Sequence, residues 1–425
     1  MVPLLRPARR VYSKDPTWPA LTARANSGRL AAWHRLGATL TWLGTQPISR
    51  GEEMSHLHIP RTAGSRIGAS LAVLVWLGVS GASPATAASD RGTFSIVAYD
   101  SVTQEMGVAV QSKYFSVGTD VPWAEAGVGA VATQARVDPS FGLKALGLLR
   151  TGLRAADVLR ALAATDSVWD SRQLGIVDAR GGVANWTGSK CLDWAGGEAG
   201  ADFVCQGNIL AGPAVVSGMA KAYRESKGEM AERLLAALDA AQAAGGDKRG
   251  MQSAALLVVR PNATRPQFTQ RYIDLRVEDH KTPIKELRRL LEIQEGFHGA
   301  DNHLFYADQY EAAGRADLAT RERERVAETL RRALGRGERD ASMLNGLAWA
   351  CATHDLYLED ALKAAERAAS LEPRNVDILD TLAEVYFRHG NPAKAIEVES
   401  RAASIDPKSQ YLKDQIERFR RGGGG

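Results

Sequence analysis

Thr93-Phe-Ser-Ile-Val-Ala-Tyr99 and Met106-Gly-Val-Ala-Val-Gln-Ser112 are two short runs in which β-branched and other apolar residues dominate. The polar run Asp100-Ser-Val-Thr-Gln-Glu105 separates them and is typical of a turn. The sequence therefore predicts a β-hairpin over residues 93–112.

Further β-rich and helical runs follow this hairpin in alternating blocks. We expect strands at 127–133, 174–177, 183–186, 253–259 and 270–276, and helices at 140–150, 155–164, 213–226 and 229–244. Blocks of strands separated by pairs of helices favour antiparallel sheets covered by helices over a parallel βαβ sheet. The expected fold is therefore of the α+β class, with two packed sheets between two helical layers (αββα).

Five ordered motifs in this region resemble a bacterial family known as domain of unknown function 1028. The motifs are Thr93–Ala98, Gly107–Lys113, Val121–Ala124, Gly127–Ala135 and Gln206–Gly212, and the segments 274–280 and 283–291 continue the resemblance. The resemblance covers about residues 93–295 and implies a four-layer αββα sandwich like that of N-terminal nucleophile (Ntn) hydrolases. It also implies that the first residue of the first strand, Thr93, is the nucleophile.

Thr93 is a residue type that Ntn catalysis can use. A threonine hydroxyl attacks an amide or ester carbonyl, and the free α-amine of the same residue, with a pKa of about 7.7–8.0, acts as the base. The Gly92–Thr93 bond must then be cut, and we expect a self-cleavage that depends on the Thr93 hydroxyl. The alternative is that Thr93 is simply a favourable strand residue.

Four more residues are candidates for the same site. Lys113 ends the second strand and could lower the pKa of the threonine hydroxyl or amine, or merely cap the strand. Asn208, expected in a Gly-flanked turn, could donate a hydrogen bond to an oxyanion or only to its own backbone. Gln134 and Asp138 follow the third strand and are candidate substrate-binding residues.

Several other chemistries are disfavoured by the sequence. No histidine occurs between residues 93 and 279, which excludes a histidine base or a histidine-based metal site in this unit. The dinucleotide and Walker-type glycine motifs are absent as well, so a nucleotide site is disfavoured. We therefore expect no cofactor and no metal ion.

The N-terminal region has the pattern of an export signal. Residues 67–82 are uncharged and apolar but shorter than a membrane span, Arg61 and Arg66 precede them, and an Ala-x-Ala site follows. We expect a signal peptide over 54–88, starting at Met54, and a periplasmic or secreted protein. A retained membrane anchor is the alternative. Residues 1–53 are then a non-native or disordered extension.

Charge and cysteine content narrow the possibilities further. The net charge of +4 comes from this N-terminal region, so no nucleic-acid partner is expected. Three cysteines are too few for a four-thiolate zinc site. Export would permit a disulfide between Cys191 and Cys205, and the alternative is two small buried thiols.

Residues 296–421 are expected to be helical and to repeat. Ala361 and Ala395, like Ala368 and Ala402, are 34 residues apart, and a proline follows each second helix. This period and pattern resemble the tetratricopeptide repeat, with residues 300–336 as a degenerate third pair. Such repeats present a concave face to a peptide or protein. The alternative is a packing module or a homodimer contact.

The sequence thus favours an exported Ntn-type amidohydrolase that acts on a peptide or a related amide and binds a partner through its repeats. The alternative function is a catalytically inactive αββα binding or scaffold protein that uses the repeats for protein interaction. A free α-amine on Thr93 distinguishes the two.

Overall fold

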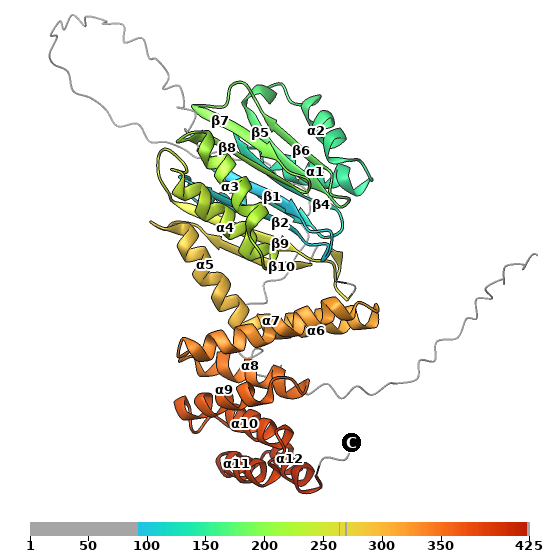
Figure 1. Cartoon of the computed structure of the whole chain (residues 1–425), viewed down its shortest axis with the longest axis vertical. Coiled ribbons are helices and arrows are strands. Elements are labelled where there is room, and N and C mark those ends of the chain that lie inside the picture. The colour runs from blue at the N-terminus through green and yellow to red at the C-terminus, as the bar shows by residue number, and fades with distance from the viewer. Residues whose placement is uncertain (1–91, 263, 268–269, 423–425) are drawn as a thin grey trace, which may run out of the picture. The chain divides into compact units, whose positions relative to one another are not determined.

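The computed structural model describes residues 92–422 apart from residues 263, 268 and 269 (Figure 1). The expected extension at 1–53 and the expected signal peptide at 54–88 lie outside the described residues. Within the part of the chain that is described, the helices are too short or too polar to cross a membrane.

Residues 93–277 contain two antiparallel sheets. The larger sheet has the strand order β10-β9-β2-β1-β8-β7, and the smaller sheet has the order β3-β4-β5-β6. The strands are β1 (Thr93–Tyr99), β2 (Met106–Ser112), β3 (Pro122–Glu125), β4 (Gly129–Ala135), β5 (Arg172–Asp178), β6 (Val183–Thr187), β7 (Trp194–Ala199), β8 (Phe203–Leu210), β9 (Ser253–Val259) and β10 (Arg271–Val277). The predicted hairpin is confirmed, since β1 pairs with β2 from Thr93–Ser112 to Tyr99–Met106.

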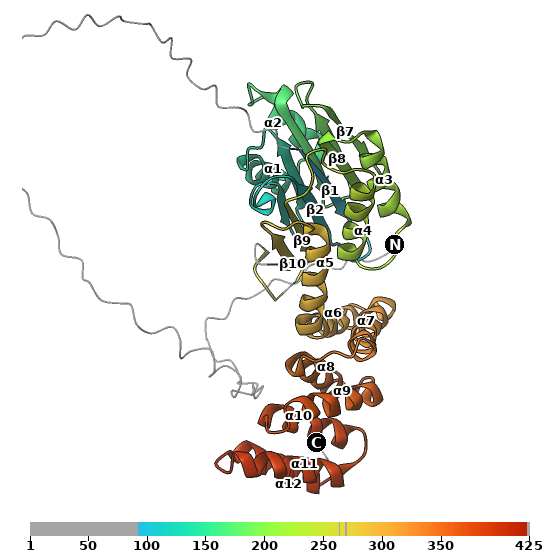
Figure 2. The ribbon, with the colours of Figure 1, turned by 90° about the vertical axis from the view of Figure 1, so that its left-hand side faces the viewer.

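Helices cover the outer face of each sheet, and the inner faces pack together (Figures 1 and 2). The smaller sheet carries α1 (Ser140–Arg150) and α2 (Ala155–Ala163), and the larger sheet carries α3 (Pro213–Glu225), α4 (Met230–Ala243) and α5 (Pro283–Gln294). Side chains alternate along β1 accordingly. Phe94 and Ile96 pack against the helices, whereas Val97 and Tyr99 lie in the core between the sheets.

The chain is helical beyond β10. Helix α5 continues without a loop through a π-helical turn, Glu295–Gly299, into α6. The remaining helices are α6 (Ala300–Ala312), α7 (Ala316–Gly335), α8 (Ala341–Thr353), α9 (Leu358–Leu371), α10 (Val376–Arg388), α11 (Pro392–Ile405) and α12 (Gln410–Arg420). The alanines that repeat at a spacing of 34 are fully buried in the core of this region.

Some predicted elements need correction. The structure adds the short strand β3, and it adds the edge strand β7 in the Gly-rich stretch between Cys191 and Cys205. Gly196 and Gly197 carry no side chains, so β7 shows no alternating pattern in the sequence. The prediction that Asn208 lies in a turn is wrong, because Asn208 belongs to β8 and pairs with Thr93.

All three cysteines are free thiols, so Cys191 and Cys205 are not bridged. Cys205 is buried, as the second alternative has it, whereas Cys191 is not. Cys205 faces the helix-covered side of the larger sheet, and burial raises its pKa well above the usual value. Cys191 is half-buried, and its thiol lies 3.5 Å from the carbonyl oxygen of Arg172.

A buried carboxylate on α11 predicts a pH-dependent stability. Burial, with the nearby charges of Asp380 and Glu384, raises the pKa of Glu399 to about 8, although Arg418 opposes the shift. Because the pKa of Glu399 is higher in the folded state than in the unfolded state, the free energy of unfolding falls as pH rises toward 8. We expect thermal melting to show a loss on the order of 1 kcal/mol per pH unit between pH 6 and 8. Glu399→Gln should flatten this dependence, and an unchanged slope would contradict the assignment.

Candidate active site at the start of β1

Thr93 is the first residue of β1, a central strand of the larger sheet, and it pairs with one residue on each of the two neighbouring strands. It lies opposite Ser112 at the end of β2 and opposite Asn208 near the end of β8. All three side chains are on the same face of the sheet as Val97, so they point into the space between the sheets. Thr93 is buried, with 4% of its surface exposed.

A chain of hydrogen bonds links Thr93 to the peptide bond that precedes it. The Ser112 hydroxyl lies 3.0 Å from the Thr93 hydroxyl and donates to the carbonyl oxygen of Gly92 over 2.5 Å. A serine hydroxyl has one proton, and a carbonyl oxygen can only accept. The Thr93 hydroxyl must therefore donate to Ser112, which in turn donates to Gly92.

The same carbonyl oxygen accepts a second hydrogen bond, from a cation. Arg249 Nη2 donates to Gly92 O over 2.8 Å. Buried Asp247 holds this guanidinium, accepting from Nε at 3.0 Å and from Nη2 at 2.8 Å. A Cβ atom at position 92 would lie 2.6 Å from Asp247 Oδ1, so the close approach requires glycine.

Three amide side chains connect this end of β1 to the smaller sheet. Gln134 on β4 donates to Thr93 O at 3.3 Å and to Gln173 Oε1 at 2.8 Å. Asn208 donates to the same Gln173 oxygen at 2.9 Å. Gln173 on β5 donates in turn to Gly207 O at 2.8 Å. All three amides are buried, so their hydrogen bonds hold the two sheets together beside Thr93.

Comparisons with known proteins assign this part of the chain to a family. Residues 93–287 match the model of a family of unknown function, DUF1028. A crystal structure of a DUF1028 protein from Silicibacter pomeroyi is 33% identical, and the match covers 48% of this chain and 89% of that chain, with a TM-score of 0.44. The chain belongs to the DUF1028 family. No curated protein matches it.

The DUF1028 region brings together three of the five predicted site residues, namely Thr93, Asn208 and Gln134. The ammonium of Lys113 is exposed and donates to Met251 O at 3.3 Å, and it is the Lys113 backbone N–H that contacts Asp247. Asp138 lies at the start of α1. Although burial opposes the shift, hydrogen bonds from Ser140, with the nearby charge of Arg172, lower the pKa of Asp138.

Four residues of this DUF1028 site were not predicted from the sequence. Ser112 could have been found, because a hairpin over 93–112 places its first and last residues opposite each other. Gln173 immediately precedes the predicted strand 174–177 and gave no signal of its own. Asp247 and Arg249 follow α4, more than 150 residues after Gly92, and only the packing of the sheet brings them to its carbonyl.

Proposed function

We propose that the DUF1028 region is an N-terminal nucleophile amidohydrolase with Thr93 as its nucleophile. The observation that carries the proposal is the hydrogen-bond chain from the Thr93 hydroxyl through Ser112 to Gly92 O. In support of the proposal, two linked hydroxyls and a carbonyl oxygen that accepts two hydrogen bonds meet at one peptide bond. The position of Thr93 at the head of a central strand, in a sandwich of two sheets between helices, also supports the proposal.

The first step proposed is self-cleavage between Gly92 and Thr93. The Thr93 hydroxyl oxygen attacks the Gly92 carbonyl carbon and passes its proton to Ser112, while the Ser112 proton moves to the carbonyl oxygen. The carbon–nitrogen bond then breaks while the former carbonyl oxygen releases the proton that it took and the Thr93 nitrogen gains one, which leaves an ester between Gly92 and the Thr93 oxygen. Water hydrolyses the ester, giving a carboxylate on Gly92 and a free α-amine on Thr93.

Arg249 and Ser112 would stabilise the developing negative charge on the carbonyl oxygen during this step. Preorganised donors aimed at such an oxygen commonly contribute a factor of about 10² to 10³ in rate each. After cleavage the same two donors would be available for the carbonyl of a substrate. The Thr93 amine would then act as the base for the Thr93 hydroxyl, and the substrate class would be a peptide or a related amide.

Covalent labelling tests the nucleophile directly. A β-lactone acylates activated hydroxyls, so we expect mass spectrometry of the labelled protein to place one acyl group on Thr93. Thr93→Val should abolish labelling, and Thr93→Ser should retain it. Thr133→Val is the matched control, because Thr133 is a buried strand threonine on the other face of its sheet. Labelling that persists in Thr93→Val would overturn the proposal.

We further propose that helices α8 to α11 are repeats of the tetratricopeptide type that bind a peptide or protein partner. The specific observation in favour is the burial of Ala361, Ala368, Ala395 and Ala402, which repeat at a spacing of 34 within two helical hairpins. Export to the periplasm or the medium remains part of the same proposal. It is supported by the sequence pattern before residue 88.

A further inference from the structure

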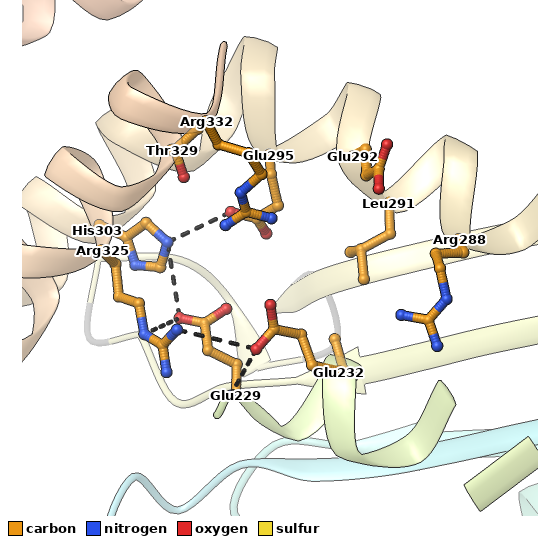
Figure 3. Close-up of a pocket in the computed structure, with 11 residues that line it drawn as sticks. Glu229, Glu232, Arg288, Leu291, Glu292, Glu295, His303, Arg325, Thr329 and Arg332 are labelled. Atoms are coloured by element: carbon orange, nitrogen blue, oxygen red, sulfur yellow. Dashed lines mark hydrogen bonds and ion pairs between the residues drawn. The ribbon is translucent and has the colours of Figure 1, made fainter. Parts of the chain in front are cut away.

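A second polar cluster lies where α4, the π-helical turn and α6 meet (Figure 3). Glu229 precedes α4, Glu295 begins the π-helical turn, and His303 lies on α6. One ligand atom from each of these residues lies within 4.8 Å of the other two. We propose that these three side chains bind a divalent transition-metal ion of the Zn²⁺ type.

The orientation of His303 favours a metal ligand. The ring is 1% exposed, and its Nδ1 lies 2.8 Å from Glu322 Oε2. Glu322 itself pairs with the guanidinium of Arg260, which holds the carboxylate in place. With its proton on Nδ1, the ring directs the lone pair of Nε2 toward the other two carboxylates. A histidine held by a carboxylate in this way is the usual outer shell of a protein-bound zinc ion.

The distances at Nε2 match the spacing of ligands around one ion. His303 Nε2 lies 3.3 Å from Glu295 Oε2 and 3.6 Å from Glu229 Oε1. Tetrahedral ligands with bonds of about 2.0–2.2 Å lie about 3.3–3.5 Å from one another. A direct bond between a charged nitrogen and a carboxylate is shorter, at about 2.7–2.9 Å. These two distances, with all three atoms within 4.8 Å of one another, therefore leave room for a cation between them.

The surrounding backbone supports the two carboxylates. A Cβ atom at position 299 would lie 2.5 Å from Glu295 Oε2, so glycine in the π-helical turn leaves space for that carboxylate. Glu229 takes part in the capping box of α4, which restricts its side chain. Arg325 approaches Glu229 only to 3.8 Å, which is too long for a hydrogen bond.

A cavity of about 50 Å³ adjoins the three ligands and is lined also by Thr329 and Arg332. One water molecule needs about 10–15 Å³ of such space. The cavity can therefore supply a water ligand at a fourth coordination position, which is the arrangement of an open zinc site.

Metal titration of the chelator-treated full chain tests the site. We expect isothermal titration with ZnCl₂ to give one ion per chain, and Zn²⁺ to raise the melting temperature. Glu295→Gln and His303→Ala should weaken binding by about 100-fold or more, and Glu322→Gln by about 10-fold. Glu292→Gln is the matched control, since Glu292 lines the same cavity but pairs with Arg336.

Further readouts separate this proposal from its rivals. Co²⁺ bound in place of Zn²⁺ should give visible absorption that His303→Ala abolishes, while Thr93→Val should bind Zn²⁺ like the wild type. Absence of binding, or equal binding by Glu295→Gln, would show that the cluster is only an ion-pair network around a protonated histidine. Preference for Mg²⁺ over Zn²⁺ would exclude the Nε2 nitrogen as a ligand, since imidazole favours the transition metal.

Discussion

Thr93→Val should leave the chain uncut before residue 93, whereas the wild-type protein should begin at Thr93. The substitution removes the hydroxyl that the Ser112 relay connects to the Gly92 carbonyl, but it keeps the shape and β propensity of the side chain. Intact mass measured on the purified exported protein would show the difference. The same spectrum would show whether the predicted signal peptide has been removed.

Two more substitutions should affect this cleavage for separate reasons. Arg249→Met removes the charged donor to Gly92 O and should slow cleavage about 10²- to 10³-fold. Gly92→Ala places a Cβ atom against the Asp247 carboxylate and should displace the carbonyl from its donors. Thr133→Val should be cut normally. A wild-type protein that keeps residues 89–92 would remove the α-amine base, and the binding or scaffold function would then be favoured.

Arg260→Met should cause the largest loss of stability. Arg260 is 2% exposed, forms ion pairs with Glu105 and Glu322, and stacks on the ring of Tyr306 with 3.7 Å between guanidinium carbon and ring centroid. Removing one member of a buried ion cluster leaves uncompensated charges and costs about 3–5 kcal/mol. Urea unfolding of the full chain, followed by circular dichroism, would measure this loss.

A compensating variant makes the test specific. Arg260→Met combined with Glu105→Gln and Glu322→Gln removes the unpaired charges along with the cation. It should recover much of the lost free energy, because neutral groups of similar shape often replace a buried ion cluster without loss. If Arg260→Met alone costs less than about 1 kcal/mol, the cluster does not stabilise the junction between β9, α6 and α7.

Local patterns predicted the elements of the fold better than the site. The hairpin over 93–112 and most helices follow from alternation and periodicity, which are properties of neighbouring residues. Strand β8 does not follow from such patterns, because its sequence Phe-Val-Cys-Gln-Gly-Asn-Ile-Leu contains glycine and asparagine. Part of it was therefore predicted to be a turn. Its burial against β1 and the amide network outweighs those local preferences.

The residues that make up the two candidate sites were harder to predict, because contacts between distant segments of the chain bring them together. Thr93 and Asn208 were found through family motifs, but Arg249 reaches Gly92 only after α4 has packed on the sheet. The expectation of no metal rested on the lack of histidine between 93 and 279. Glu229 lies within that interval, yet its nearest histidine is His303, which the helical region supplies. The candidate metal ligands therefore come from two segments, Glu229 from the sheet region and Glu295 and His303 from the helical region, and no sequence pattern connects the two.

Helix α6 places Leu304 in the core of the C-terminal helices and Tyr306 in the core of the sandwich. Two residues two positions apart thus belong to different cores, so α6 is a wall that both cores share. Gene fusion or domain exchange at residue 296 would remove all of α6, and Tyr306 with it, from the core of the sandwich. A functional graft of new helices onto this sandwich should therefore keep α6.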